Sequence, residues 1–255
     1  MIENLEEVLS CRTHGDFNAR KVSAGRVEMV IRTCPRCADD AVSAAERKKI
    51  EDDQKNRRDS YERRLNECCI PPRFVGQTFQ NYVVSGDGQR HAVKVCEDYA
   101  QEFYKHLKNG DGLIFTGNTG NGKNHLAIGI AQAIIENGYM AQYITASDFI
   151  SKMTAWQTDK SAASQDSIVG MMTQPDLLIL DEVGVGSSTD FQRDTLFRLI
   201  DARYRERKPV ILMGNVSMAE LRLFVGERSF DRLKQMTLRQ VPFTWASYRG
   251  RELNA

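Results

Sequence analysis

The strongest chemical signal in the sequence is a glycine-rich segment at residues 117–124, which reads GNTGNGKN. It follows the apolar run GLIFT and precedes HLAIGIAQAII, a pattern typical of a strand, a tight turn and a buried helix. Glycines let successive backbone N–H groups point at phosphate oxygens, and a helix N-terminus adds partial positive charge. The segment matches G-x-x-x-x-G-K-[ST] except at its last position, and it predicts a phosphate-binding loop.

Two side chains of this loop have chemistry of their own. Lys123 supplies a mobile positive charge for the β- and γ-phosphates of a nucleotide. Asn124 stands where a hydroxyl usually meets Mg²⁺, and its amide oxygen is a hard ligand for that ion, directly or through water. The alternative is a glycine-rich turn with a chance lysine. The predicted phosphate site comprises Gly117, Asn118, Thr119, Gly120, Asn121, Gly122, Lys123 and Asn124.

A second candidate element is the apolar run LLILDE, which ends in Asp181 and Glu182. Beside a phosphate loop, the aspartate would hold Mg²⁺, directly or through water. The glutamate would orient and deprotonate an attacking water. The alternative is an ordinary buried strand that ends in a charged turn.

Two pairs of metal-binding residue types lie near the N-terminus, Cys11 with His14 and Cys34 with Cys37. Two short pairs on two turns can place four ligands at tetrahedral reach, which suits Zn²⁺. A segment of about 40 residues with little hydrophobic core needs a bound metal or a comparable cross-link to stabilise its fold. Unpaired thiols, or a redox pair at Cys34 and Cys37, are the alternatives. The pattern does not decide whether this module would bind protein or DNA.

The elements that must position these residues follow from the apolar pattern. Short apolar runs at residues 113–116, 140–145, 177–181, 210–213 and 241–243 alternate with helical patterns at 123–136, 148–156 and 191–205. This alternation predicts an α/β fold, with a parallel sheet covered by helices on both faces. Residues 41–67 are charged and lack Gly and Pro, which predicts a solvated helix ended by Pro71 and Pro72. We therefore expect a zinc module at 1–40, a helical linker at 41–72 and an ATPase domain at 73–255.

Composition limits the function classes. The 255 residues carry 35 Lys and Arg against 34 Asp and Glu, a formal net charge of +1, so nucleic-acid affinity must come from local patches. The acidic N-terminus does not resemble a signal peptide, and no apolar run reaches the ~18 residues of a membrane span. We expect a cytoplasmic protein with no membrane partner.

The order of the blocks GNTGNGKNHLA, LLILDEVGV, GNVSMAEL and GERSFDRL resembles the bacterial and phage replicative helicase loaders of the DnaC type and the related IstB-type helper ATPases. Both belong to the AAA+ class, so the resemblance implies an AAA+ P-loop NTPase three-layer core with a five-stranded parallel sheet. It also implies that Asn215 holds the lytic water or γ-phosphate and that Arg232 completes a neighbouring subunit's site. Arg228 is the reserve candidate for that arginine. His125 and Arg249 match positions near the nucleotide.

The resemblance implies an ATPase that loads a hexameric replicative helicase onto single-stranded DNA. It would use ATP and Mg²⁺ and self-associate into a ring or spiral. The rival readings are an IstB-like transposition helper and an ATP-switched adaptor with weak hydrolysis caused by Asn124. Residues 147–173 are long enough to hold a DNA-contacting insertion, and the candidate contacts for single-stranded DNA are Tyr104, Lys152, Trp156 and Lys160.

Overall fold

The computed structural model describes residues 2–24, 27–158 and 163–248. Its internal contacts divide the chain into two compact units, Met1–Ser60 and Tyr61–Ala255. Helix α1 (Pro35–Glu67) contributes to both units. Each unit is described separately below.

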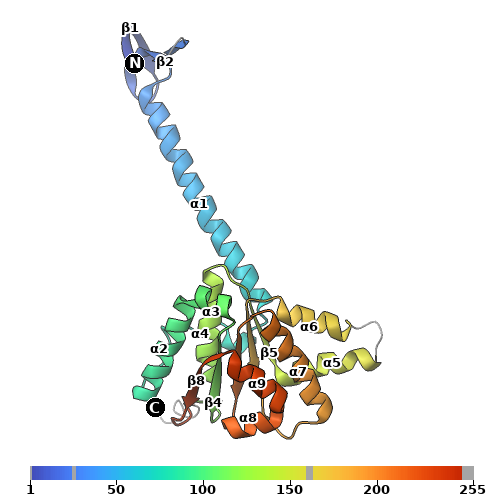
Figure 1. Ribbon diagram of the computed structural model, residues 1–255. Coiled ribbons are helices and arrows are strands. Elements are labelled where there is room, and N and C mark those ends of the chain that lie inside the picture. The colour runs from blue at the N-terminus through green and yellow to red at the C-terminus, as the bar shows by residue number, and fades with distance from the viewer. Residues whose placement is uncertain (1, 25–26, 159–162, 249–255) are drawn as a thin grey trace. The chain divides into compact units, whose positions relative to one another are not determined.

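The first unit begins with a three-stranded antiparallel sheet of order β1-β2-β3 (Figure 1). Its strands are β1 (Ile2–Cys11), β2 (Gly15–Ala24) and β3 (Val27–Ile31). Among the described apolar residues of this unit only Ala19 and Cys34 are buried, whereas Ile2, Val8 and Met29 are more than 60% exposed. The small sheet therefore has almost no hydrophobic core.

Helix α1 begins at Pro35, six residues before the expected start, because proline is well tolerated in the first turn of a helix. None of its residues is buried. Opposite charges recur four residues apart, as in Arg47–Glu51–Lys55, and such pairs stabilise an exposed helix. The division of the chain at residues 40 and 72 stays a prediction.

The second unit contains five parallel strands in the order β5-β6-β7-β4-β8. The strands are β4 (Gly112–Gly117), β5 (Ala141–Thr145), β6 (Leu177–Asp181), β7 (Val210–Gly214) and β8 (Thr237–Phe243). The predicted parallel sheet is confirmed, and four of the five runs agree with the strands to within a residue. Strand β8 starts four residues before its apolar run, because its first half is an exposed, polar part of an edge strand.

Helices cover both faces of this sheet, which gives the expected three layers (Figure 1). Alternate strand residues separate the two cores: Ile179 packs in one apolar cluster, Leu178 and Leu180 in the other. The first face carries η1 (Pro72–Phe74), α2 (Asp87–Gln101), α3 (Phe103–Asn109) and α4 (Lys123–Glu136), and the second carries α5 (Ala146–Thr158), α6 (Gln165–Thr173), α7 (Asp190–Arg205), α8 (Met218–Val225) and α9 (Glu227–Gln235).

No helix in the described part of the chain combines the length and the apolar run that a membrane crossing requires.

The strand order determines where the candidate site lies. Strand β7 runs between β4 and β6, so the segments that follow these three strands meet at one edge of the sheet. The glycine-rich loop follows β4, the acidic pair ends β6, and Asn215 follows β7. Sites of open parallel sheets form at this carboxyl edge.

Candidate nucleotide site and metal cluster

Two glycines give the loop between β4 and α4 its shape. Gly117 has φ +128°, and a Cβ there would lie 2.1 Å from the carbonyl oxygen of Phe243. Gly122 has φ +93°, and a Cβ there would lie 2.7 Å from the ring of Tyr82. Both positions combine a left-handed backbone with a close neighbour, so only glycine fits.

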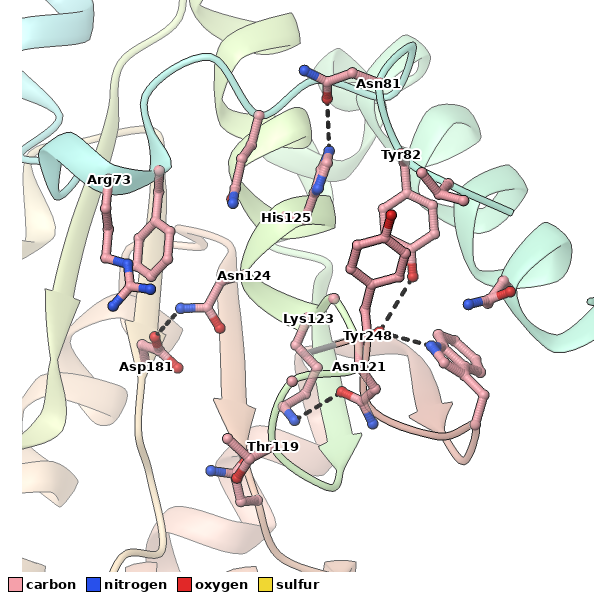
Figure 2. A pocket seen from close by; sticks show the side chains of 18 of the residues that line it. Arg73, Asn81, Tyr82, Thr119, Asn121, Lys123, Asn124, His125, Asp181 and Tyr248 are labelled. Atoms are coloured by element: carbon pink, nitrogen blue, oxygen red, sulfur yellow. Dashed lines mark hydrogen bonds between the residues drawn. The ribbon is translucent and has the colours of Figure 1, made fainter. Parts of the chain in front are cut away.

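The Lys123 side chain folds back onto its own loop. Its Nζ donates to the carbonyl oxygens of Gly117 and Asn118, each at 2.7 Å. It also donates to Oδ1 of Asn121 at 3.2 Å (Figure 2). Asn121 is in turn held by the C-terminal segment, because its Nδ2 donates to Phe243 O at 2.6 Å and its carbonyl accepts from Trp245 Nε1 at 2.7 Å. The ammonium is thereby held inside the curve of the loop.

Three donors surround the carboxylate of Asp181, which is 5% exposed. Asn124 Nδ2 donates to Oδ2 at 2.7 Å, the Tyr143 hydroxyl donates to the same oxygen at 2.5 Å, and the backbone N–H of Glu182 donates to Oδ1 at 2.7 Å. Burial and the adjacent carboxylate raise the pKa of Tyr143, so the phenol stays protonated and remains a donor. The sequence offered no signal for Tyr143.

This arrangement gives a chemical reading of Asn124. A serine or threonine hydroxyl uses one oxygen both to donate to the aspartate and to ligate Mg²⁺. The amide of Asn124 divides these roles, since its nitrogen donates to Asp181 while its oxygen points away from that contact (Figure 2). Amide and carboxylate oxygens are hard donors, so the residues present suit Mg²⁺.

Glu182 and Asn215 line the same cavity as the loop and Asp181. Glu182 has φ +57°, a conformation that is uncommon for a residue with a Cβ and that clusters at functional sites. Strand β6 ends one residue earlier, at Asp181. The two acids and the amide therefore line one cavity from the ends of two neighbouring strands.

The cavity has a volume of about 570 Å³. Its lining includes loop residues 119–124 and His125, but not Gly117 or Asn118, whose carbonyls bind Lys123 instead. It also includes residues that the sequence analysis did not identify, because they come from distant segments. These additional residues are Arg73, Phe74, Gln77, Asn81, Tyr82, Val83, Gln89, Tyr143, Trp245 and Tyr248.

His125 fastens the segment before α2 to the start of α4. Its Nε2 lies 2.8 Å from Thr78 O and 2.8 Å from Asn81 Oδ1, and Tyr82 packs edge-on at 5.0 Å between ring centroids. Burial lowers the pKa of His125 below its ordinary value, which favours the neutral ring near neutral pH. On the other side of the loop, Tyr248 N donates to Gly120 O at 2.8 Å.

The candidate finger arginines lie on α9, outside the cavity lining. The Arg232 guanidinium stacks on Tyr204 at 4.5 Å and pairs with Asp201 at 3.2 Å. Arg228 lies 5.4 Å from the ring centre of Phe197. Arg249 falls outside the described residues.

The two candidate DNA contacts whose side chains the structure describes, Tyr104 and Lys152, do not lie together. Tyr104 lies on α3, whose Phe103 packs in the first core cluster, whereas Lys152 lies on α5, whose Met153 packs in the second. The two side chains therefore belong to opposite faces of the sheet. Lys160 lies outside the described residues, as does the side chain of Trp156.

The four predicted N-terminal ligands come together. Their ligand atoms all lie within 4.8 Å of one another, with Cys37 Sγ 3.5 Å from Cys11 Sγ and 3.3 Å from His14 Nδ1. Cys11 ends β1 and His14 lies in the β1–β2 turn, whereas Cys34 directly precedes α1 and Cys37 lies in the first turn of that helix. His14 Nε2 lies 3.1 Å from Asp40 Oδ2, an arrangement typical of zinc-ligating histidines.

Backbone hydrogen bonds prepare one of these ligands for a cation. N–H groups of Thr13 and His14 lower the pKa of the Cys11 thiol to about 6. A thiolate is the form of cysteine that binds metal. The chemistry of all four donors suits Zn²⁺.

Comparison with known proteins decides the family. The family model described as "IstB-like ATP binding protein" matches residues 51–249. The chain belongs to this family. It is also 30% identical over 199 residues to the replicative helicase loader DnaC of Escherichia coli K12, across 78% of this chain and 80% of that protein.

One further sequence relative and two solved structures are also similar to this chain. The uncharacterized protein YdaV of E. coli K12 is 28% identical over 230 residues, which is 90% of this chain and 91% of that protein. The crystal structure of the DnaC helicase loader superposes with a TM-score of 0.61 at 22% identity, over 68% of this chain and 99% of that chain. That of DnaI gives 0.59 at 18% identity, over 71% and 95%. These structures show that this member of the IstB-like family has their AAA+ fold.

Proposed function

We propose that this IstB-like ATP binding protein hydrolyses ATP to load a hexameric replicative helicase onto single-stranded DNA, in the cytoplasm. One observation supports the proposal above the others. The phosphate loop, Asp181, Glu182 and Asn215 line a single cavity in a chain that matches four fifths of a helicase loader. The likeness to DnaC is the reason for proposing a replicative helicase as the partner and single-stranded DNA as the nucleic acid.

The chemistry proposed for the cavity assigns one role to each group. Lys123 leaves its loop carbonyls and neutralises the β- and γ-phosphates, and the Asn124 oxygen and Asp181 hold Mg²⁺. Glu182 orients and deprotonates the attacking water, while Asn215 holds that water or the γ-phosphate without adding charge. Mg²⁺ supplies charge neutralisation of the phosphates when it is bound.

A neighbouring copy would complete this site. Lys123 and Arg73 are the cationic side chains of the described chain that line the cavity, apart from the largely neutral His125. Two carboxylates and a triphosphate leave excess negative charge there. We assign the missing charge to Arg232 of an adjacent subunit in a ring or spiral, because Asp201 and Tyr204 already hold its guanidinium in one orientation.

The N-terminal module would bind one Zn²⁺ through Cys11, His14, Cys34 and Cys37 and grip the helicase. The four convergent ligand atoms support the metal. Apolar side chains support a protein partner, since the strand register sets the exposed Ile2 and Met29 on either side of the half-buried Val22 on one face of the sheet. DNA phosphates would not require such a surface.

A second candidate is a transposition helper of the IstB type, favoured by the description of the family model. It would use the same ATP chemistry but act with a transposase. An ATP-switched adaptor would bind ATP with little turnover. The three differ in partner and in turnover, so partner binding and ATPase rate distinguish them.

A mixing experiment tests the hydrolysis mechanism. Lys123→Ala removes a subunit's own phosphate contact. Arg232→Ala removes the arginine that the subunit would place in its neighbour's nucleotide site. Each variant alone should be inactive in a DNA-stimulated ATPase assay, and an equal mixture should recover part of the wild-type rate. Arg228→Ala changes the reserve candidate on the same helix and should stay active if Arg232 is the arginine that acts in trans. A mixture as inactive as its components would contradict action in trans.

A further inference from the structure

Tyr143 is fixed at both of its ends in the described structure. It lies on β5, the edge strand of the sheet, where its backbone N–H donates to Cys68 O at 2.7 Å. Its ring is 6% exposed and packs in the core cluster beneath α4. Because its register partner on β6 is Ile179, two residues before Asp181, the side chain extends along the strand direction to reach the carboxylate.

The donors around Asp181 are divided unequally between its two carboxylate oxygens. A carboxylate oxygen has two lone pairs. Tyr143 and Asn124 both donate to Oδ2, whereas Oδ1 accepts only the Glu182 N–H among the hydrogen bonds of the described residues. One lone pair of Oδ1 therefore remains for Mg²⁺ or for a water in its coordination shell.

We propose that Tyr143 is a positioning residue for the metal of the ATP site: its hydroxyl fixes the Asp181 carboxylate so that Oδ1 presents its open lone pair to Mg²⁺ or a Mg²⁺-bound water. The inference rests on the proposed ATP function and adds a residue that lies outside the loop and acidic motifs. Without the phenol, Asp181 would keep Asn124 and the Glu182 N–H but could rotate. The expected consequence is weaker metal binding with intact nucleotide binding.

The structure provides a matched control for a merely structural role. Tyr99 is a second buried phenol of the same core cluster, 1% exposed, and its hydroxyl donates to Asp111 O at 2.7 Å. It does not line the nucleotide cavity. Tyr99→Phe and Tyr143→Phe therefore remove the same atom from comparable packing, and only the second removes it from the metal site.

The test is a Mg²⁺ titration of the full-length protein with a fluorescent, non-hydrolysable ATP analogue, read by anisotropy. Mutation of outer partners of metal ligands typically costs 10–100-fold in metal affinity. We expect Tyr143→Phe to raise the Mg²⁺ concentration at half-saturation by about 10-fold. Binding without Mg²⁺ should match wild type. Tyr99→Phe should leave the Mg²⁺ midpoint unchanged, and thermal melts should show that both variants fold.

The outcomes separate the two proposals. If wild-type protein binds no nucleotide, the ATP function and this inference both fail. If Mg²⁺ strengthens wild-type binding and Tyr143→Phe shows the same midpoint, the positioning role is wrong while the ATP function stands. An equal midpoint shift in Tyr99→Phe would likewise overturn it, because loss of either phenol would then act through general stability.

Discussion

The two units of the chain maintain their structures by different means. The second unit buries two apolar clusters on opposite faces of a five-stranded sheet. The first has a three-stranded sheet with exposed Ile2, Val8 and Met29 but brings four metal-ligand atoms within 4.8 Å of one another. Hydrophobic burial is available to a domain of about 190 residues and hardly available to a sheet of three strands.

The two units also differ in how far the family match covers them. The IstB-like family match covers residues 51–249, so it includes nearly all of the unit with the large core. The module before it lies almost wholly outside that match.

The largest expected effect comes from metal removal. Structural zinc contributes roughly 10–16 kcal/mol of apparent binding free energy to small zinc domains. Cys34→Ser with Cys37→Ser should therefore abolish the single zinc per chain and expose residues 2–31 to fast hydrogen exchange. The amides of β4 should stay protected. A full zinc content in the double variant, or loss of protection in both units, would break the comparison.

The next effect concerns chemistry in the second unit. Glu182→Gln removes the proposed general base but keeps the shape of the side chain, and the ATPase rate should fall by about 10²–10⁴-fold. Nucleotide binding and zinc content should match wild type. An unchanged rate in steady-state turnover assays would mean that Glu182 is not the base.

A pair of identical truncations compares the two cores. Ile130 is fully buried in α4, whereas Ile2 is 67% exposed on β1. Ile130→Ala should cost about 2–5 kcal/mol in the free energy of unfolding, and Ile2→Ala should fall within about 0.5 kcal/mol. Denaturant melts of each unit measure both. A similar large cost at Ile2 would reveal a hydrophobic core that the small sheet is not expected to have.

The smallest effect is a pH dependence confined to the second unit. Burial lowers the folded-state pKa of His125 below its ordinary value of about 6.5. The stability that this residue contributes is thus present above pH 6.5 and is lost as the pH falls through the folded-state pKa. Melting temperatures between pH 7.5 and 5 should decline less in His125→Asn than in wild type. Identical slopes would refute the contribution.

The sequence predicts those parts of the site that lie within one continuous segment. The phosphate loop and Asp181–Glu182 each combine a strand, a turn and their functional side chains in a few residues, so their pattern is readable. Tyr143, Arg73 and Trp245 join the cavity only because the strand order and chain path bring distant segments together. Single-sequence patterns contain no such information.

In the N-terminal module, too, part of the structure could be predicted from the sequence and part could not. The paired spacings predict the four ligands, but β1 was not expected, because most of its residues are exposed, none is buried and no apolar alternation marks a face. The roles of Arg232 and Arg228 depend on a neighbouring subunit, and Arg249 lies outside the described residues. All three roles stay predictions.

The most direct test of helicase loading is the native mass of the full-length protein mixed with its host's hexameric replicative helicase, with and without ATP and Mg²⁺. We predict a discrete complex of helicase and loader whose stoichiometry depends on nucleotide. Absence of any complex under both conditions, from protein that still binds ATP, would contradict the proposed function and favour the transposition helper or the adaptor.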